Sequence, residues 1–247
     1  MKNNFRTIDA LRMLSLAVLC LFMFNCGNDD GGGPKTGYFA KTIVVSMAGS
    51  DMRFEFEYDT KNHIIRERTI IGGATGHLEY RYNEAGMIST ILRDGTLFAH
   101  YEYDDSGILT NLEAYDGSSG SNTDYPVLFS DGTYSIVGLV PDVRVDREGQ
   151  LLHHSGLDLV VTHTDGPGVH RHLTPQPARY FGEIGAYNLY NLTLSQKAVA
   201  SIELRGTVYE AHYQKDGNNN ITHMELVDGT TGTRYQIWDI TYEERSL

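Results

Sequence analysis

The chain is poor in the residues that most often carry chemistry or hold small proteins together. Only two of its 247 residues are cysteines and one is a tryptophan. Its 32 acidic residues outnumber its 20 basic ones. The formal net charge of −12 repels phosphate groups, which excludes nucleic acid as a direct partner. Long hydrophobic runs are also missing, because the apolar stretch from Leu14 to Phe24 has eleven residues and is too short for a membrane-spanning helix.

That stretch instead has the length and position of a signal-peptide core. Lys2, Arg6 and Arg12 supply the positive segment in front of it. We therefore expect residues 1–25 to be a signal peptide that is removed from the mature chain. The alternative is an N-terminal anchor that is never cleaved.

Cys26 follows the apolar stretch directly and is the expected site of lipidation. Residues 21–27 resemble a lipobox, although Phe24 and Asn25 replace the usual small residues before the cysteine. Cys20 is the other candidate, but it lies inside the apolar core. If Cys26 is acylated and Cys20 leaves with the signal, no disulfide or cysteine-ligated metal site remains possible within one chain.

The residues behind Cys26 predict a flexible tether. Residues 27–35 are rich in Gly, Asn and Asp and cannot build a core, so we expect residues 26–36 to be the lipidated cysteine and its tether. Acidic residues at this position resemble the surface-export signal of Bacteroidota lipoproteins, which implies an outer-membrane protein displayed at the cell surface. Solvation of the linker is the alternative explanation. Residues 37–247 are predicted to form a single domain.

One phrase occurs three times between residues 54 and 115. The copies read Phe56-Glu57-Tyr58-Asp59, Tyr80-Arg81-Tyr82-Asn83 and Tyr101-Glu102-Tyr103-Asp104. Aromatic residues two apart share one face of a strand, and Asp or Asn then opens a turn by bonding its own backbone. Each copy therefore predicts a β-hairpin, and Gly107 in the third turn is expected to have a positive φ.

The phrase Tyr-x-Tyr-Asp-x-x-Gly-x-Leu resembles the YD repeat of the RHS type. The tyrosines at 58, 82 and 103 lie 24 and 21 residues apart, near the period of that repeat, and weaker copies occur at residues 145–151 and 213–217. The chain looks more like the small YD-repeat lipoproteins of Bacteroidota than like large RHS toxins. This resemblance implies an all-β fold, either a strongly curved sheet or a porin-like soluble barrel, and it implies no catalytic residues.

The remaining sequence also predicts an antiparallel meander that must curve or close to cover its aromatic face and its edges. The expected strands are Phe39–Met47, Met52–Tyr58, Ile64–Ile71, Met87–Leu92, Ile108–Tyr115, Val127–Phe129, Thr133–Val140, Leu151–His154, Leu157–Thr162, Val208–Tyr213, Ile221–Val227 and Thr233–Tyr242. Residues 116–124 and 163–178 are expected to be loops. Apolar positions 190, 192 and 194 favour a further strand, with a helical turn over Leu194–Ala200 as the alternative.

The histidines form the one cluster that suggests chemistry. Five of the ten fall within twenty residues, at His153, His154, His163, His170 and His172. His170 and His172 would share one side of an extended stretch, and zinc needs three or four such ligands. His163, His170 and His172 are therefore the candidate metal ligands. Polar decoration of a long surface loop is the alternative.

Motifs for catalysis or cofactor binding are missing. Neither a Gly-x-Ser-x-Gly elbow nor a Gly-rich phosphate loop is present, so we expect no catalytic residue and no cofactor. The sixteen tyrosines could stack on sugars, yet their repeat positions predict packing in the core. This expectation covers Tyr58, Tyr80, Tyr82, Tyr101 and Tyr103, and Trp238 is expected to pack there as well.

These features predict a lipid-anchored lipoprotein of the cell envelope whose all-β domain binds or scaffolds. The bilayer is its partner through Cys26. A glycan, a peptide or a neighbouring envelope protein could be the ligand, and the sequence does not choose among them. The alternative is a metal-dependent or glycan-cleaving hydrolase built around residues 153–172.

Overall fold

The protein is all-β, as the sequence predicts. The computed structural model describes residues 35–47, 49–115, 121–124, 126–128, 131–136, 143–146, 148–174 and 189–247. Within these ranges the chain forms seventeen strands and two short 3₁₀ helices. No helix there combines the length and the apolar composition that crossing a bilayer requires.

The first nine strands are β1 (Thr36–Met47), β2 (Ser50–Tyr58), β3 (Ile64–Ile71), β4 (Ala74–Tyr82), β5 (Ile88–Arg93), β6 (Thr96–Tyr103), β7 (Leu109–Tyr115), β8 (Ser121–Asp124) and β9 (Pro126–Leu128). The second half contains β10 (Tyr134–Ile136), β11 (Val143–Val145), β12 (Leu151–His154), η1 (Ser155–Leu157), β13 (Leu159–Pro167), η2 (Leu189–Leu194), β14 (Lys197–Leu204), β15 (Thr207–Lys215), β16 (Ile221–Asp228) and β17 (Arg234–Ser246).

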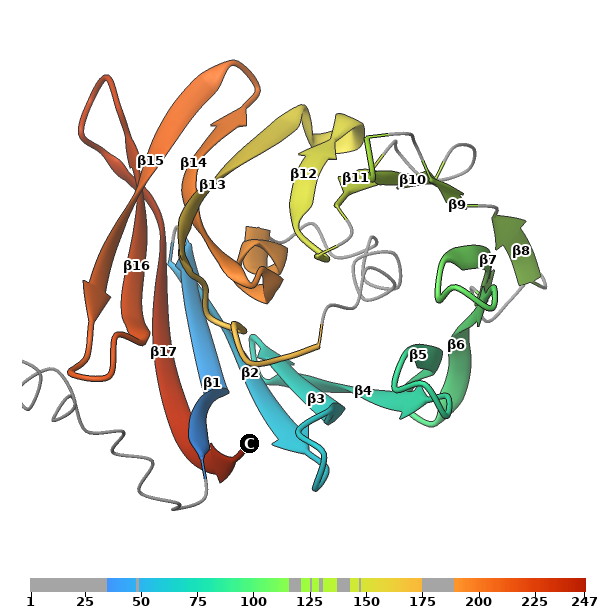
Figure 1. The fold of residues 1–247 in the computed structure, drawn as a ribbon. Helices are drawn as coiled ribbons and strands as arrows, with labels where there is room; N and C mark the ends of the chain where they lie inside the picture. Colours follow the sequence, from blue (N-terminus) through green and yellow to red (C-terminus); the bar gives the residue numbers. More distant parts are fainter. Residues whose placement is uncertain are drawn as a thin grey trace, which may run out of the picture. The chain divides into compact units, whose positions relative to one another are not determined.

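The strands form one antiparallel meander. Each pairs with the next from β1 to β8 and again from β9 to β17, and the last strand returns to pair with the first. β8 and β9 are one residue apart, and no ladder joins them among the residues that the structure describes. The sheet therefore curves into a ring with one interruption (Figure 1), which confirms the predicted strongly curved meander.

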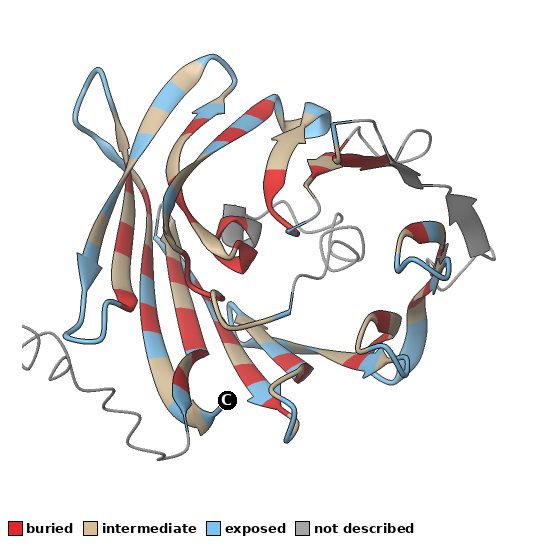
Figure 2. Ribbon diagram, viewed as in Figure 1, coloured by how far each residue is buried: buried red, intermediate tan, exposed pale blue. Residues whose placement is uncertain are grey.

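Buried and exposed residues alternate along many of the strands (Figure 2). On β2, Met52, Phe54, Phe56 and Tyr58 are buried, while the residues between them face outward. Trp238 on β17 is fully buried, as predicted. An apolar inner face and a polar outer face is what period-2 patterning produces when only one side of a sheet meets water.

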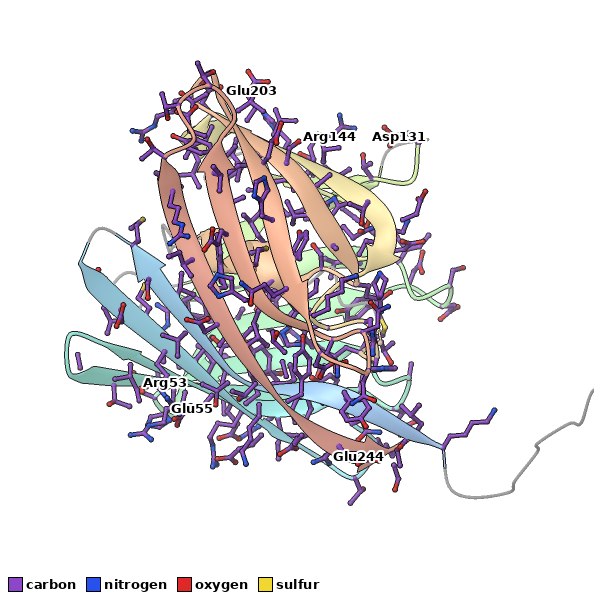
Figure 3. The ribbon with its side chains drawn as sticks, turned by 90° about the vertical axis from the view of Figure 1, so that its left-hand side faces the viewer. Arg53, Glu55, Asp131, Arg144, Glu203 and Glu244 are labelled. Atoms are coloured by element: carbon purple, nitrogen blue, oxygen red, sulfur yellow. The ribbon has the colours of Figure 1, made fainter. Side chains whose placement is uncertain are left out.

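The outer face of β2 and β3 carries a row of ion pairs. Glu55 accepts from Arg53 at 2.7 Å and from Arg68 at 3.1 Å, and Arg66 reaches Glu57 at 3.0 Å. Figure 3 shows Arg53 and Glu55 projecting away from the sheet. Exposed pairs of this kind contribute about 0–1 kcal/mol each, so they keep this face hydrated more than they stabilise the fold.

All five copies of the repeat fold into one kind of turn, including the two weak ones. The backbone N–H of the first residue donates to the carbonyl of the fifth, from Asp59 to His63, Asn83 to Met87, Asp104 to Ile108, Asp146 to Gln150 and Asp216 to Asn220. The fourth residue has a positive φ in every copy, at Asn62, Gly86, Gly107, Gly149 and Asn219. The prediction for Gly107 is confirmed, with φ 76°. In the fifth copy the left-handed residue is Asn219 and not the glycine at 217.

The last tyrosine of each strong copy ties its strand to the preceding one. Tyr58 donates to the carbonyl of Ala40, Tyr82 to that of Ile64 and Tyr103 to that of Ile88, at 2.6, 2.7 and 2.8 Å. Tyr213 and Tyr242 do the same for Val199 and Ile221. The core prediction is confirmed for Tyr58, Tyr80 and Tyr101, which are buried, and Tyr82 and Tyr103 are half-buried against the same core.

The predictions of two loops, at residues 116–124 and 163–178, are partly wrong. Residues 121–124 form β8, and residues 163–167 extend β13, whereas residues 116–120 and 175–178 lie outside the described part. β13 keeps its pairing with β14 through two register shifts, at Thr162/His163 and at His163/Pro167. Bulges of this kind let a segment that contains Gly and Pro stay paired in a sheet. The alternation of its residues alone does not predict that the segment is a strand.

The prediction between residues 190 and 204 is also wrong. Residues 189–194 form η2 instead of a strand, and residues 197–204 form β14 instead of a helical turn. Leu192, Thr193 and Leu194 are consecutive and all buried, because η2 lies inside the ring and meets the core on several sides (Figure 1). Burial on several sides abolishes the alternation on which strand prediction depends.

Candidate functional site

The five repeat turns lie at the same end of the ring. They follow β2, β4, β6, β11 and β15, and the antiparallel pairing makes these five strands run in one direction. We call this end the repeat-turn rim. It carries the Asp, Asn and Gly residues of all five turns, which are far apart in sequence.

Residues 168–174, here called the strap, run from the end of β13 into the ring at this rim. Gly168 donates its N–H to the carbonyl of Gln196, and a Cβ at Gly168 would lie 2.7 Å from the carbonyl oxygen of Lys197. His170 packs edge-on against Phe56 with ring centroids 5.4 Å apart. His172 packs on Phe39 at 5.7 Å. The strap therefore covers the inner face of β1 and β2.

Arg171 fastens the strap to the fifth repeat turn. Its guanidinium donates to the carbonyl oxygens of Asn219 and Asn218 at 3.0 and 3.2 Å, and to Oδ1 of Asn220 at 2.8 Å. A planar guanidinium suits such a cluster of acceptors because its donors are held in a rigid fork. The strap is thus held at its first residue, Gly168, and again at its middle residue, Arg171.

The three histidines proposed as metal ligands have separate surroundings. His163 Nε2 lies 3.1 Å from Oγ of Ser195, whereas His170 and His172 pack on different phenylalanine rings. Within the described ranges no group of three or more His, Cys, Asp or Glu residues is placed to hold a metal ion. His153 and His154 sit on β12, and the Nδ1 atom of each is buried and has no hydrogen-bond partner among the residues that the structure describes.

The His163–Ser195 pair is a buried link between β13 and the residues after η2. Burial lowers the pKa of His163 to about 4, and the nearby Lys197 charge acts in the same direction. Ser195 is 1% exposed, so a substrate has no access to its hydroxyl. A neutral imidazole bonded to a buried hydroxyl is a structural contact, and the geometry gives no support to the hydrolase alternative at residues 153–172.

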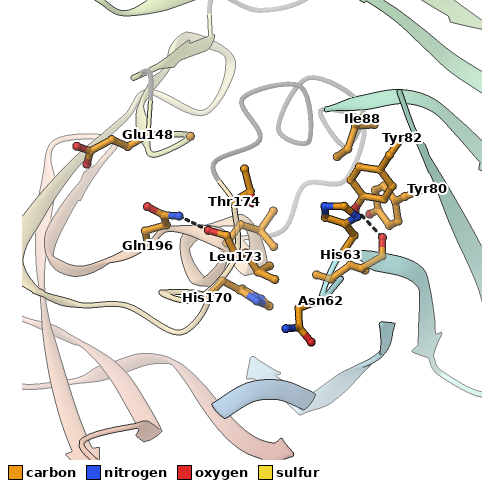
Figure 4. Close-up of a pocket in the computed structure, with 13 residues that line it drawn as sticks. Asn62, His63, Tyr80, Tyr82, Ile88, Glu148, His170, Leu173, Thr174 and Gln196 are labelled. Atoms are coloured by element: carbon orange, nitrogen blue, oxygen red, sulfur yellow. Dashed lines mark hydrogen bonds between the residues drawn. The ribbon is translucent and has the colours of Figure 1, made fainter. Parts of the chain in front are cut away.

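A small cavity lies between the strap and the first two repeat hairpins (Figure 4). Asn62, His63 and Tyr82 face His170 and Leu173 across it, and its volume is about 30 Å³. A space of this size holds at most about one ordered water. The cavity is therefore part of the packed interior and too small for an organic ligand.

A larger, shallow hollow lies on the solvent side, between the first and second repeat turns. Its volume is about 390 Å³, and its lining includes Asp59, Lys61, Asn83 and Glu84. His63 and Tyr82 line both this hollow and the inner cavity. Their rings stack with centroids 4.4 Å apart and planes at 19°. The stacked pair thus separates the rim hollow from the interior of the ring.

The first repeat turn is held rigidly in place. The Asp59 carboxylate accepts from the backbone N–H groups of Lys61 and His63 at 2.8 and 2.9 Å, and Nδ1 of His63 lies 3.1 Å from its other oxygen. Partial burial alone would raise the pKa of Asp59, but these hydrogen bonds outweigh it and lower that pKa. The ring of His63 is consequently oriented by an ionised carboxylate.

The end of β17 braces the same turn from the other side. Arg245 donates to the carbonyl of Asp59 at 2.6 Å and to Oδ1 of Asn62 at 2.9 Å. The amide of Asn62 in turn donates to the carbonyl of Ser246 at 2.7 Å. One wall of the hollow is thus held by two segments that are 186 residues apart in the sequence.

Exposed polar groups surround the stacked rings. Lys61 and Glu84 are exposed, and neither forms an ion pair with any residue that the structure describes. Oδ1 of Asn83 accepts from the N–H of Met87 at 2.9 Å, which turns the side-chain amide nitrogen away from that bond. The hollow therefore offers hydrogen-bond donors and acceptors beside the stacked His63–Tyr82 pair, an arrangement suited to binding a polar ligand.

Sequence reasoning missed this site, although one signal for it exists. The position after the left-handed turn residue holds His63 in the first copy, and the other copies hold Met87, Ile108, Gln150 and Asn220. Alignment of the five turns on their left-handed residue would have singled out the one imidazole. That its ring stacks on Tyr82 of the next copy follows only from the curvature of the sheet.

Comparison with known proteins gives remote structural likeness only. No family model matches the chain and no curated protein matches it. Similar solved structures include a porin-like protein from Bacteroides uniformis ATCC 8492 (TM-score 0.48, 11% identity, covering 83% of this chain and 98% of that one). Another is a porin-like protein from Bacteroides vulgatus ATCC 8482 (TM-score 0.38, 12% identity, 84% and 99%). The structure of TcdB2-TccC3-TEV also matches (TM-score 0.19, 11% identity, 76% and 10%).

These values assign neither a family nor a function to the chain. Identities of 11 and 12% and TM-scores of 0.48 and less are compatible with many arrangements of antiparallel strands. The YD-repeat resemblance stays a prediction. Function therefore has to be argued from the site itself.

Proposed function

We propose that this protein is a lipid-anchored lipoprotein of the cell envelope, attached to the outer membrane through Cys26 and exposed at the cell surface, and that its β domain binds a ligand at the repeat-turn rim. The anchor is supported by the sequence alone, since a short apolar stretch precedes Cys26 and a Gly- and Asp-rich tether follows it. An anchored domain on a flexible tether can present one face to partners outside the membrane.

The observation that carries the binding role is the rim hollow. It places exposed groups of both charges beside the stacked His63–Tyr82 pair, and the two turns that form its walls are each held by hydrogen bonds of an Asp or Asn side chain to the backbone. Rigid walls reduce the entropy lost on binding. A glycan, a peptide or an envelope protein remains the class of ligand for this role.

The anchor is tested by substitution of the two cysteines in the full-length chain. Cys26→Ala should abolish incorporation of an alkyne-labelled fatty acid and release the protein into the soluble fraction, whereas Cys20→Ala should change neither. Protection from protease on intact cells would place the domain in the periplasm. Unchanged membrane retention of Cys26→Ala would contradict the lipoprotein assignment.

The binding role is tested by filling the hollow. Ala85 lines it, and Ser106 occupies the equivalent position in the third turn. Ala85→Trp should abolish retention on arrays of envelope glycans and peptides that bind the wild type, whereas Ser106→Trp should not. Equal retention of the two variants would show that the ligand binds elsewhere.

A further inference from the structure

We infer that the repeat-turn rim is the surface of the domain that faces the lipid bilayer. The opposite end of the ring, here called the far end, carries the turns between β3 and β4 and between β16 and β17, and it points away from the membrane. This orientation rests on the proposed lipid anchor at Cys26. Three properties of the chain support it: the place where the tether joins the ring, the length of the tether and the length of the strands.

The tether joins the ring at the rim. β1 begins at Thr36, and this first residue pairs with Ser246 in the last turn of the register between β1 and β17. The carbonyl of Ser246 accepts from the side-chain amide of Asn62, in the first repeat turn, at 2.7 Å. That turn forms one wall of the rim hollow. The chain therefore enters the domain beside the hollow.

The tether is short. Ten residues separate Cys26 from Thr36, and they span at most about 35 Å when fully extended. A Gly-rich coil of that length has a typical end-to-end distance of about 17 Å. Thr36 therefore stays close to a lipidated Cys26, and the first repeat turn stays close to the bilayer with it.

The strands are long compared with the tether. β1 has 12 residues and β17 has 13, which correspond to about 40 Å of strand. Figure 3 shows Glu244, near the rim, and Glu203, near the far end, at opposite ends of the sheet. If the far end faced the bilayer, the tether would have to run back along β1 and would be close to full extension. Full extension costs a Gly-rich chain much of its conformational entropy, so the rim is the end that faces the membrane.

Exposed acidic groups hold the rim off the lipid head groups. Glu84, Asp104, Asp105 and Asp216 are exposed on three of the five repeat turns. Anionic head groups repel such a surface. The tether thus keeps the rim near the bilayer while the charges keep it from adsorbing. A ligand of the rim hollow then binds in the hydrated layer between the domain and the membrane.

Fluorescence energy transfer to the bilayer tests this orientation. The mature, acylated chain is purified from membranes and placed in vesicles of phosphatidylethanolamine and phosphatidylglycerol that carry a rhodamine-labelled lipid in the outer leaflet. Acylation of Cys26 and removal of Cys20 leave no free thiol, so one introduced cysteine takes the donor dye.

Ser106→Cys and Thr230→Cys form a matched pair for the donor. Ser106 lies in the third repeat turn at the rim, and Thr230 lies in the turn between β16 and β17 at the far end. Both side chains are exposed, and the backbone N–H of each donates to an Asp two residues earlier, at 2.9 and 2.7 Å. Both variants should therefore fold like the wild type, which the circular dichroism spectrum checks.

The rate of transfer should be more than about tenfold higher from the rim than from the far end, because it falls with the fourth power of the height above the acceptors and the two heights differ by about one strand length. Equal rates from the two positions would mean that the ring lies on its side. A higher rate from Thr230→Cys would mean that the far end faces the bilayer. Either result would overturn the inference.

The outcome is separable from that of the proposed function. Fatty-acid labelling that depends on Cys26, together with equal rates or a higher rate from Thr230→Cys, would refute the orientation and leave the anchor intact. Absence of fatty-acid labelling, with no transfer from either position, would refute the anchor and the orientation together.

Discussion

Among single residues, Gly107 shows most directly how the backbone selects a side chain. Its φ is 76°, and nothing lies within 4 Å of the position that a Cβ would occupy. Gly107→Val should therefore lower the free energy of unfolding by about 1–3 kcal/mol through backbone strain alone. The measurement is the urea midpoint at constant m.

The chain itself provides the control for that substitution. Asn62 and Asn219 occupy the same turn position with φ 66° and 62°. Asn tolerates the left-handed conformation, so Gly107→Asn should cost much less than Gly107→Val. Equal midpoints for the two variants would show that strain is not the cause.

His223, on the outer face of β16, should make stability depend on pH. Its Nδ1 lies 2.7 Å from Asp239, and its Nε2 lies 3.0 Å from Glu225. Partial burial alone would lower the pKa of His223, but the hydrogen bonds to Glu225 and Asp239 outweigh it and raise that pKa above its ordinary value. Protonated His223 is thus favoured in the folded chain.

The sign of the effect follows from this raised pKa. The stabilisation is fully present below the unfolded pKa, about 6.5, and is lost as the pH rises through the folded value. Wild type should therefore lose stability relative to His223→Gln between about pH 6 and pH 8.5, by less than about 1 kcal/mol because the carboxylates are partly solvated. Thermal denaturation of both proteins at the two pH values measures the difference, and parallel curves would contradict it.

Among elements, the strap depends on close approach of its backbone to that of β14. A Cβ at Gly168 would lie 2.7 and 2.8 Å from the carbonyl oxygen and carbon of Lys197, which are backbone atoms and cannot rotate away. Gly168→Ala should displace the strap and cost about 1–3 kcal/mol of unfolding free energy. Gly217→Ala is the control, because nothing lies within 4 Å of its Cβ position.

Displacement of the strap should also be visible locally. His172 packs on Phe39 and His170 on Phe56, so a shifted strap removes both ring contacts from the inner face of β1 and β2. Hydrogen exchange of the β1 and β2 amides should therefore accelerate in Gly168→Ala and not in Gly217→Ala. Unchanged protection together with an unchanged urea midpoint would show that the strap tolerates a Cβ.

For the whole domain, the continuous core predicts a single unfolding transition. One cluster of buried residues includes side chains from β1 through β7, from β10 through β14 and from β16 and β17, together with Leu192 and Leu194 of η2, and half-buried side chains of β15 pack against it. Trp238, the only tryptophan, is fully buried in it. Its fluorescence and the far-UV circular dichroism should change at the same urea concentration. Separate midpoints would mean that part of the ring unfolds alone.

Local chemistry was sufficient to predict the repeat hairpins. An Asp or Asn that caps its own turn, followed by a residue that tolerates positive φ, specifies the turn within five residues, which is why even the weak copies at Asp146 and Asp216 fold like the strong ones. Alternation with period two likewise predicted the buried face of β2, and the apolar neighbours Ile237 and Ile240 predicted the burial of Trp238. Both signals act between near neighbours in the chain.

What the tertiary structure decided depends on contacts between distant segments. η2 is not a strand because the ring surrounds it with apolar side chains, and β14 is a strand because β13 and β15 lie on its two sides. The rim hollow exists because the curved sheet stacks His63 on Tyr82 of the next hairpin and because Arg245, at the far end of the chain, braces the turn at Asp59. A hairpin's own sequence specifies its turn, but the free energy that selects its neighbours comes from burying surfaces far apart in sequence, and no local pattern contains it.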